Sequence, residues 1–219
     1  MKENIKYIEE MLLLQDKLNI ATCGENYKIS KVTKENRKID FARCIYMECA
    51  ELIDSLPWKH WKSIDAKWDI QNIKIELVDI WHFILSLALI NNQKDVFTKV
   101  FNEYKNYKSS NKLDDILLYS KELIHYSSAK DCNLIEILNA FLILLDILEF
   151  NFSDLFKIYI GKNVLNQFRQ DNGYKNGTYK KIWDNKEDNV ILYEILESLK
   201  EVNFDVVYNE LGKIYKGVK

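Results

Sequence analysis

The sequence predicts an all-α fold, built as a single-domain multi-helix bundle over residues 1–219. Apolar side chains recur at three- and four-residue spacing in nearly every segment, which is the period of an amphipathic helix. Strict alternation of apolar and polar residues, the pattern of a half-buried strand, is scarce. With 47% hydrophobic residues but only 6 Gly and 1 Pro, the chain is neither disordered nor turn-dense.

The first three helices follow from apolar spacing and end signals. We expect the first over about residues 2–19, with a polar loop around Gly24. The second begins after Asp40, a residue type that caps helix N-termini, and ends before Pro57, which disfavours helix in the residue ahead of it. The third, over about residues 69–91, is the most apolar, and we place it at the centre of the bundle.

The remaining chain continues the same pattern. Six further helices are expected at about residues 94–107, 112–127, 132–150, 153–169, 188–200 and 203–215.

One stretch differs from the rest in composition. Lys157–Lys186 carries seven basic and two acidic side chains, in a chain whose formal net charge is −2. It also holds three of the 6 glycines, Gly161, Gly173 and Gly177. Because glycine tolerates backbone conformations that other residues avoid, we expect the chain to leave the helix here and to approach a ligand closely.

The overall charge and the apolar stretches exclude several classes of protein. A net charge of −2 supplies no sustained positive field, so we expect neither nucleic acid nor a membrane as partner. The N-terminus has no basic region followed by an uninterrupted apolar run, so we expect a cytoplasmic protein. The two most apolar stretches, 77–90 and 134–150, are interrupted by ionisable residues and are too short to span a bilayer.

Two pairs of carboxylates give the clearest chemical signal. Glu48 and Glu51 are three residues apart on the second predicted helix, and Glu76 and Asp79 repeat this spacing on the third. Such spacing puts both members of a pair on one helix face. A single pair of this kind most often faces solvent. Repetition on two apolar helices instead indicates a hard divalent cation such as Mg²⁺ or Mn²⁺, because buried carboxylates need a compensating cation.

These pairs and several further blocks resemble the all-α NTP pyrophosphatase superfamily, the MazG-like and dimeric dUTPase group. The four carboxylates alone indicate the superfamily, whereas the C-terminal blocks resemble the dimeric dUTPases. The similar blocks are Met47–Asp54, Trp58–Lys62, Glu76–Phe83, Gly161–Gln170, Gly173–Lys181 and Trp183 with Glu187–Asn189, all within Leu14–Asn189. The stretch at about residues 92–130 resembles only the variable central part of the family, so no role is transferred to it.

The resemblance implies Mg²⁺-dependent hydrolysis of dUTP, and of dUDP, to dUMP, with Mn²⁺ as a substitute cation. It assigns metal binding to Glu48, Glu51, Glu76 and Asp79. Such cations neutralise phosphate charge and lower the pKa of water. Glu48 or Glu51 then acts catalytically by taking the proton of the water, and we favour Glu48.

The basic segment at about residues 157–189 is expected to bind the phosphates. Arg169 offers a planar bidentate donor, whereas lysines act as point charges. The alternative for each lysine is a solvated surface role, which we prefer for Lys157 and Lys186. The expected substrate-binding residues are Lys162, Asn166, Arg169, Tyr174, Lys175, Lys181 and Asn189 from this segment, and Lys59, Trp61 and Lys62 from the connector after the first carboxylate pair.

Uracil recognition requires paired donors and acceptors beside a flat apolar wall. Gln15 and Asn19 lie four residues apart on one face of the first helix and match a family element. Phe83, one turn after Asp79, is expected to stack on the base. For Trp81 we prefer a role in the core.

Two other functions stay open on the sequence alone. A pyrophosphohydrolase of another deoxynucleoside triphosphate, such as dCTP, would keep the four carboxylates and change the base pocket. A non-catalytic helical interaction protein would carry carboxylates that merely face solvent. For the leading hypothesis the resemblance implies a homodimer.

Overall fold

The computed structural model describes residues 2–63, 65, 67–200 and 202–217. Its regular structure is almost entirely helical, which confirms the predicted all-α class. By its internal contacts the chain divides into two compact units, an N-terminal unit Met1–Phe152 and a C-terminal unit Ser153–Lys219. This division does not test whether the chain folds as one domain, so the single domain stays a prediction.

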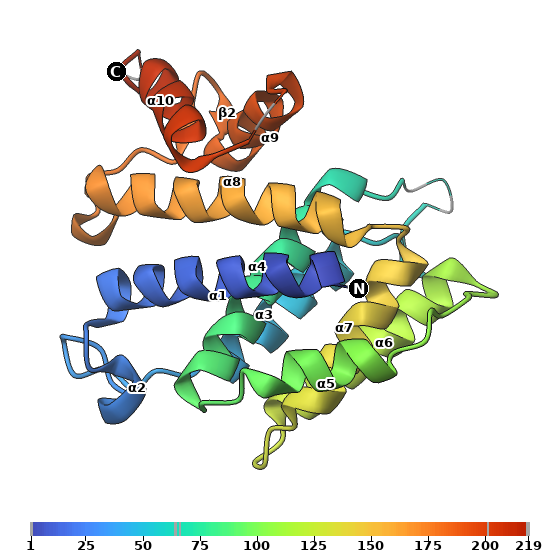
Figure 1. Ribbon diagram of the computed structural model, residues 1–219. Coiled ribbons are helices and arrows are strands. Elements are labelled where there is room, and N and C mark those ends of the chain that lie inside the picture. Colours follow the sequence, from blue (N-terminus) through green and yellow to red (C-terminus); the bar gives the residue numbers. More distant parts are fainter. Residues whose placement is uncertain (1, 64, 66, 201, 218–219) are drawn as a thin grey trace. The chain divides into compact units, whose positions relative to one another are not determined.

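The described part of the N-terminal unit holds seven helices, and six of them lie close to the predicted positions. Figure 1 shows their arrangement. They are α1 (Lys2–Cys23), α2 (Tyr27–Ser30), α3 (Phe41–Asp54), α4 (Ile70–Ile90), α5 (Asp95–Glu103), α6 (Lys112–Ser128) and α7 (Leu134–Ile147). The short helix α2 was not predicted, because four residues are too few to show a helical period.

Side-chain caps determine where the two helices of the candidate site begin. Asp40 accepts a hydrogen bond from the backbone N–H of Arg43 at 3.0 Å, as expected for an N-cap of α3. Asp69 accepts one from the N–H of Asn72 at 3.0 Å and caps α4 in the same way. These caps set the register of both helices, and therefore the positions of the carboxylates that follow.

Helix α4 forms the centre of the N-terminal unit, as its composition predicts. It packs against α1, α3 and α7 and is buried on most of its faces (Figure 1). Trp81 on α4 is fully buried; its ring stacks on Phe141 at 5.2 Å between ring centres and meets the rings of Phe97 and Phe152 edge-on. The preferred assignment of Trp81 to the core is therefore confirmed.

The C-terminal unit combines three helices with a small hairpin. Its elements are α8 (Phe152–Asp171, which begins at the last residue of the N-terminal unit), a 3₁₀ turn (Tyr174–Asn176), β1 (Ile182–Trp183), β2 (Lys186–Glu187), α9 (Asp188–Ser198) and α10 (Phe204–Tyr215). The strands pair antiparallel across Asp184 and Asn185, which both have positive φ, at 46° and 66°. Positive φ at both central residues is typical of two-residue hairpin turns, whose twist matches the twist of the paired strands. Two-residue strands are too short to show alternation, so the hairpin was not predicted.

The glycines of the basic segment serve different purposes. Gly173 and Gly177 leave helical geometry with φ of 89° and 70°, as expected. Gly161 instead lies inside α8, within the helix predicted over about residues 153–169. A Cβ at Gly161 would come within 2.7 Å of the Leu196 side chain, so this glycine lets α8 and α9 pack closely.

Among the described residues, no helix combines the length and the apolarity needed to cross a lipid bilayer.

Replacement of Trp81 by Ala is expected to lower the free energy of unfolding by about 4 kcal/mol, because it leaves a cavity in the aromatic core. Urea unfolding followed by far-UV circular dichroism measures this loss. Leu118→Ala, at a position 49% exposed on α6, is the control and should change stability by less than about 0.5 kcal/mol. A Trp81→Ala protein as stable as this control would contradict the central role of α4.

Candidate active site

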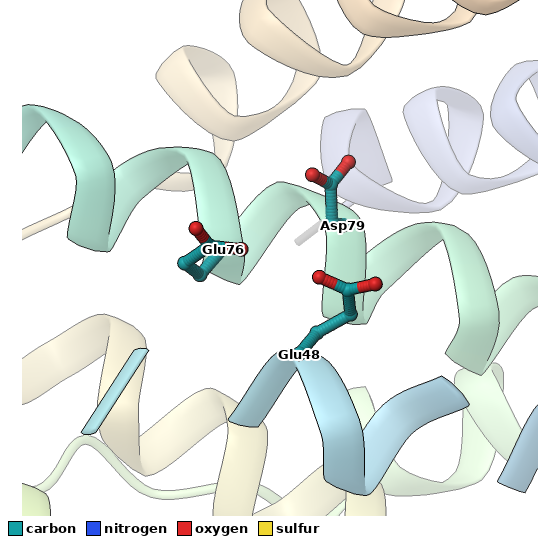
Figure 2. Close-up of side chains that lie close together, drawn as sticks. All are labelled: Glu48, Glu76 and Asp79. Atoms are coloured by element: carbon teal, nitrogen blue, oxygen red, sulfur yellow. The ribbon is translucent and has the colours of Figure 1, made fainter. Parts of the chain in front are cut away.

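Three of the four predicted metal ligands meet where α3 packs against α4. One carboxylate oxygen from each of Glu48, Glu76 and Asp79 lies within 4.8 Å of the other two. Figure 2 shows Glu48 reaching from α3 toward Glu76 and Asp79 on α4. The three-residue spacing on α4 turns its two carboxylates to the same side, as predicted.

The electrostatics of this cluster are dominated by burial and by like charge. Burial, and then the negative charges of Asp79, Glu76 and Glu51, raise the pKa of the Glu48 carboxyl to about 8. A hydrogen bond with Glu76 acts in the same direction. With this raised pKa, the protonated form of Glu48 is favoured at neutral pH in the cation-free protein.

The acidic cluster fits a hard divalent cation. Its three donors are carboxylate oxygens, which Mg²⁺ and Mn²⁺ prefer. Glu76 is only 6% exposed, and its Oε1 accepts a hydrogen bond of 3.0 Å from Nδ2 of Asn72, one turn earlier on α4. The same amide donates to Ser55 Oγ at 2.7 Å. Asn72 thus orients Glu76 from a position that the sequence analysis missed.

Glu51, the fourth predicted ligand, lies outside this three-carboxylate cluster. Its side chain is exposed and, together with Glu76, lines a cavity of about 440 Å³. Three carboxylates, those of Glu48, Glu76 and Asp79, therefore form the acidic cluster. The metal-binding and catalytic roles of Glu51 stay predictions.

The connector after α3 adds positive charge to this cavity. Lys59, Lys62 and Lys67 line it together with Glu51 and Glu76. Lys59 also forms an ion pair with Asp54. The sequence analysis named the first two lysines and missed Lys67. A cavity that offers both carboxylates and ammonium groups suits a phosphate chain accompanied by a divalent cation.

The other aromatic candidates lie in different surroundings. Trp61 is 62% exposed, meets Trp58 edge-on at 5.6 Å and does not line the cavity. Phe83 is half-buried on α4, and its ring stacks against Phe41 of α3 at 6.4 Å between centres. The substrate-binding roles of Trp61 and Phe83 stay predictions.

The two amide candidates on α1 belong to a buried hydrogen-bond network with α4. Gln15 and Asn19 are each 3% exposed, and Gln15 Nε2 donates to Asn19 Oδ1 at 3.0 Å. Gln15 Oε1 lies 2.7 Å from Nδ1 of His82, and Asn19 Nδ2 lies 3.1 Å from Oγ of Ser86. The sequence analysis missed both α4 partners, since a separation of 67 residues leaves no local pattern.

The basic candidates of α8 form a separate network within the C-terminal unit. Asp188, fully buried at the start of α9, accepts from Nε and Nη2 of Arg169 at 2.8 and 2.7 Å, and from the hydroxyl of Tyr179 at 2.8 Å. Arg169 Nη1 donates to Asn166 Oδ1 at 3.1 Å, and Nζ of Lys162 to Asn189 Oδ1 at 3.0 Å. The bidentate face that was expected to bind phosphate is therefore engaged by Asp188, which the sequence analysis did not single out.

The remaining candidates of this unit are exposed. Tyr174 lies under the guanidinium of Arg169, whose Cζ is 5.9 Å from the ring centre. Lys181 pairs with Glu187 at 3.7 Å, and Lys175 lies in the 3₁₀ turn. The substrate-binding roles of Tyr174, Lys175 and Lys181 stay predictions.

Comparison with models of protein families gives a match. A family model described as dUTPase matches residues 7–174, more than half of the chain. The matched residues contain the acidic cluster, the amide pair on α1 and Arg169, and end before Lys175. None of the curated proteins searched matches the chain.

The raised pKa of Glu48 makes the stability of the cation-free protein dependent on pH. The folded state binds this proton more tightly than the unfolded chain, where the pKa is 4.5, so stability falls as the pH rises from about 4.5 to about 8. In chelator, wild type should lose more free energy of unfolding over this interval than Glu48→Gln, by on the order of 3 kcal/mol.

Urea titrations of both proteins at pH 5 and pH 8 measure this difference. Glu10→Gln, which removes an exposed carboxylate from α1, is the control and should follow wild type. Parallel losses in wild type and Glu48→Gln would show that Glu48 does not carry the extra proton.

Proposed function

The chain belongs to the dUTPase family and is a dUTP diphosphatase, and we propose that it uses Mg²⁺ at Glu48, Glu76 and Asp79 to convert dUTP to dUMP. We extend the proposal to dUDP, which the resemblance of the sequence implies.

The acidic cluster is the observation that carries this proposal. Its oxygens suit Mg²⁺, and the adjoining cavity has a volume and a charge distribution that suit a phosphate chain. Mg²⁺ supplies charge neutralisation for the phosphates and activates water for attack on phosphorus. Glu51, exposed in the same cavity, is proposed to complete the set of ligands.

Glu48 is proposed as the group that takes the proton from the attacking water. It is half-buried, and its carboxyl lies beside both α4 ligands, where water activated by the cation would be held. A positioned carboxylate of this kind accelerates proton transfer in the transition state. Glu51, one turn further along α3, is the alternative acceptor.

Positive side chains are proposed to bind the phosphates. Lys59, Lys62 and Lys67 line the cavity beside the carboxylates and supply this charge within the N-terminal unit. Arg169 and the nearby lysines of the C-terminal unit are proposed to add further phosphate contacts. Phosphoryl transfer depends mainly on such positioning and charge stabilisation.

The uracil base is proposed to bind at the amide pair on α1. Gln15 and Asn19 offer the donors and acceptors that pair with the edge of a base, and Phe83 offers a flat ring for stacking. A base that mismatches such groups leaves them unpaired, which disfavours cytosine. We also propose that the active form is a homodimer, which sedimentation velocity would test.

Glu48→Gln is expected to lower kcat for dUTP at least about a hundredfold, because the glutamine amide cannot accept the proton. Release of pyrophosphate from dUTP, dCTP, dTTP and UTP, with dUMP formation from dUDP, should be measured with Mg²⁺ and with chelator. We expect cleavage of dUTP and dUDP alone, and none in chelator.

The exposed change Glu10→Gln is the matched control for this assay and should keep wild-type activity. Cleavage of dCTP or dTTP at rates similar to dUTP would contradict the uracil pocket while leaving the acidic cluster intact. Full activity in chelator would contradict the metal site.

Lys62→Met should raise KM for dUTP about tenfold with little change in kcat, because it removes a positive charge that contacts phosphate in both the ground and transition states. Steady-state kinetics at saturating Mg²⁺ measure both constants. Lys6→Met, at an exposed position of α1 away from the cavity, should leave KM unchanged. Equal KM values for the two variants would exclude Lys62 from substrate binding.

A further inference from the structure

Asn72, in the first turn of α4, connects the end of α3 to one of the proposed metal ligands. Its Nδ2 donates to Oγ of Ser55 at 2.7 Å and to Oε1 of Glu76 at 3.0 Å. An amide nitrogen carries two protons, so these two bonds use both of them. The Asn72 amide is therefore held at two points, and one of those points is the carboxylate of Glu76.

The acceptor at the end of α3 is itself held by several bonds. Ser55 is the C-cap of α3, and both its N–H and its Oγ donate to the carbonyl oxygen of Glu51 at 3.2 Å. The carbonyl oxygen of Ser55 accepts from the N–H of Asp69, the N-cap of α4, at 3.2 Å. Ser55 thus joins the end of α3 to the start of α4, and Asn72 extends this junction to Glu76.

The anchored carboxylate keeps its capacity to bind a cation. A carboxylate offers about four lone-pair sites on its two oxygens, so one hydrogen bond from Asn72 leaves sites for a metal ion. Glu76 is only 6% exposed, and one of its oxygens lies within 4.8 Å of oxygens of Glu48 and Asp79. The bond from Asn72 therefore accompanies the arrangement in which the three carboxylates converge.

This anchor matters because a glutamate side chain has several rotatable bonds. Restricting such a side chain to one rotamer costs conformational entropy, which weakens cation binding unless the free protein already holds the rotamer. Partners that orient a metal ligand through a hydrogen bond have measurable effects for this reason. Their loss typically lowers metal affinity by about 10- to 100-fold.

Mg²⁺ and Ca²⁺ differ in how strongly they depend on the placement of a ligand. Mg²⁺ requires a nearly ideal octahedron with bonds of about 2.1 Å, whereas Ca²⁺ accepts irregular sets of oxygens at about 2.4 Å. A carboxylate that loses its orientation therefore weakens the binding of Mg²⁺ more than the binding of Ca²⁺.

We propose that Asn72 is a positioning residue for the metal site, which holds Glu76 in the arrangement that Mg²⁺ requires and so favours Mg²⁺ over Ca²⁺. This inference rests on the proposed binding of Mg²⁺ at Glu48, Glu76 and Asp79. Asn72 does not contact the cation in this mechanism; it acts through the carboxylate of Glu76.

The test is the binding of Mg²⁺ alone and of Ca²⁺ alone to the cation-free full chain, measured by isothermal titration calorimetry. Asn72→Leu keeps a side chain of similar shape but removes the donor. It should raise Kd for Mg²⁺ about tenfold and Kd for Ca²⁺ less than about threefold. If far-UV circular dichroism shows that Asn72→Leu fails to fold, Asn72→Ala removes the same donor, and the same two shifts are expected.

Gln71→Leu is the matched control, because Gln71 is the exposed neighbour of Asn72 on α4 and does not line the cavity. Both Kd values should stay at the wild-type values in this variant. An unchanged Kd for Mg²⁺ in folded Asn72→Leu or Asn72→Ala, or equal increases for the two cations, would overturn the inference and leave the proposed metal site standing. A wild type that binds no Mg²⁺ would instead overturn the proposed metal site, together with this inference.

Discussion

Like-charged carboxylates in a half-buried space are the constraint on which the N-terminal unit depends. At the contact between α3 and α4, burial and then the negative charges of Asp79 and Glu76 disfavour the ionised form of Glu48. The apolar packing of α4 and the capping of both helices hold the groups together nevertheless. Part of the folding free energy is therefore retained as electrostatic repulsion, and a cation that relieves it binds and stabilises at once.

Successive turns of α4 carry most of the proposed site. Glu76 and Asp79 provide carboxylates, Phe83 offers a ring one turn later, and His82 and Ser86 reach the amides of α1. Because one rigid helix positions all of these groups, the spacing between the phosphate end and the base end of the site is determined by helix geometry. Trp81, buried on the core side of the same helix, keeps that helix in place.

Local patterns in the sequence predict the helices well, because caps and three-residue spacings act within one or two turns. Asp40 and the pair Glu76 and Asp79 are examples. Three of the four carboxylates that were predicted to bind a metal ion lie together. The partners that the sequence analysis missed are distant along the chain: Asp188 lies 19 residues from Arg169, and His82 lies 67 from Gln15. Tertiary packing selects such pairs, so no periodicity reveals them. The substrate contacts of Glu51 and of the lysines depend on a ligand, and they stay predictions.

The pairing of Arg169 with Asp188 bears on the phosphate binding that is predicted for the C-terminal unit. The fully buried carboxylate of Asp188 balances the charge of the Arg169 guanidinium. Arg169 therefore adds little to the net positive potential of this unit. The phosphate contacts predicted for this unit then involve exposed lysines such as Lys175 and Lys181, of which Lys181 pairs with Glu187 at 3.7 Å. Fields from exposed charges are screened within about 8 Å at physiological ionic strength. The proposed binding of phosphate by these exposed lysines would therefore weaken as the salt concentration rises, whereas the hydrogen bonds buried around α4 would be screened much less.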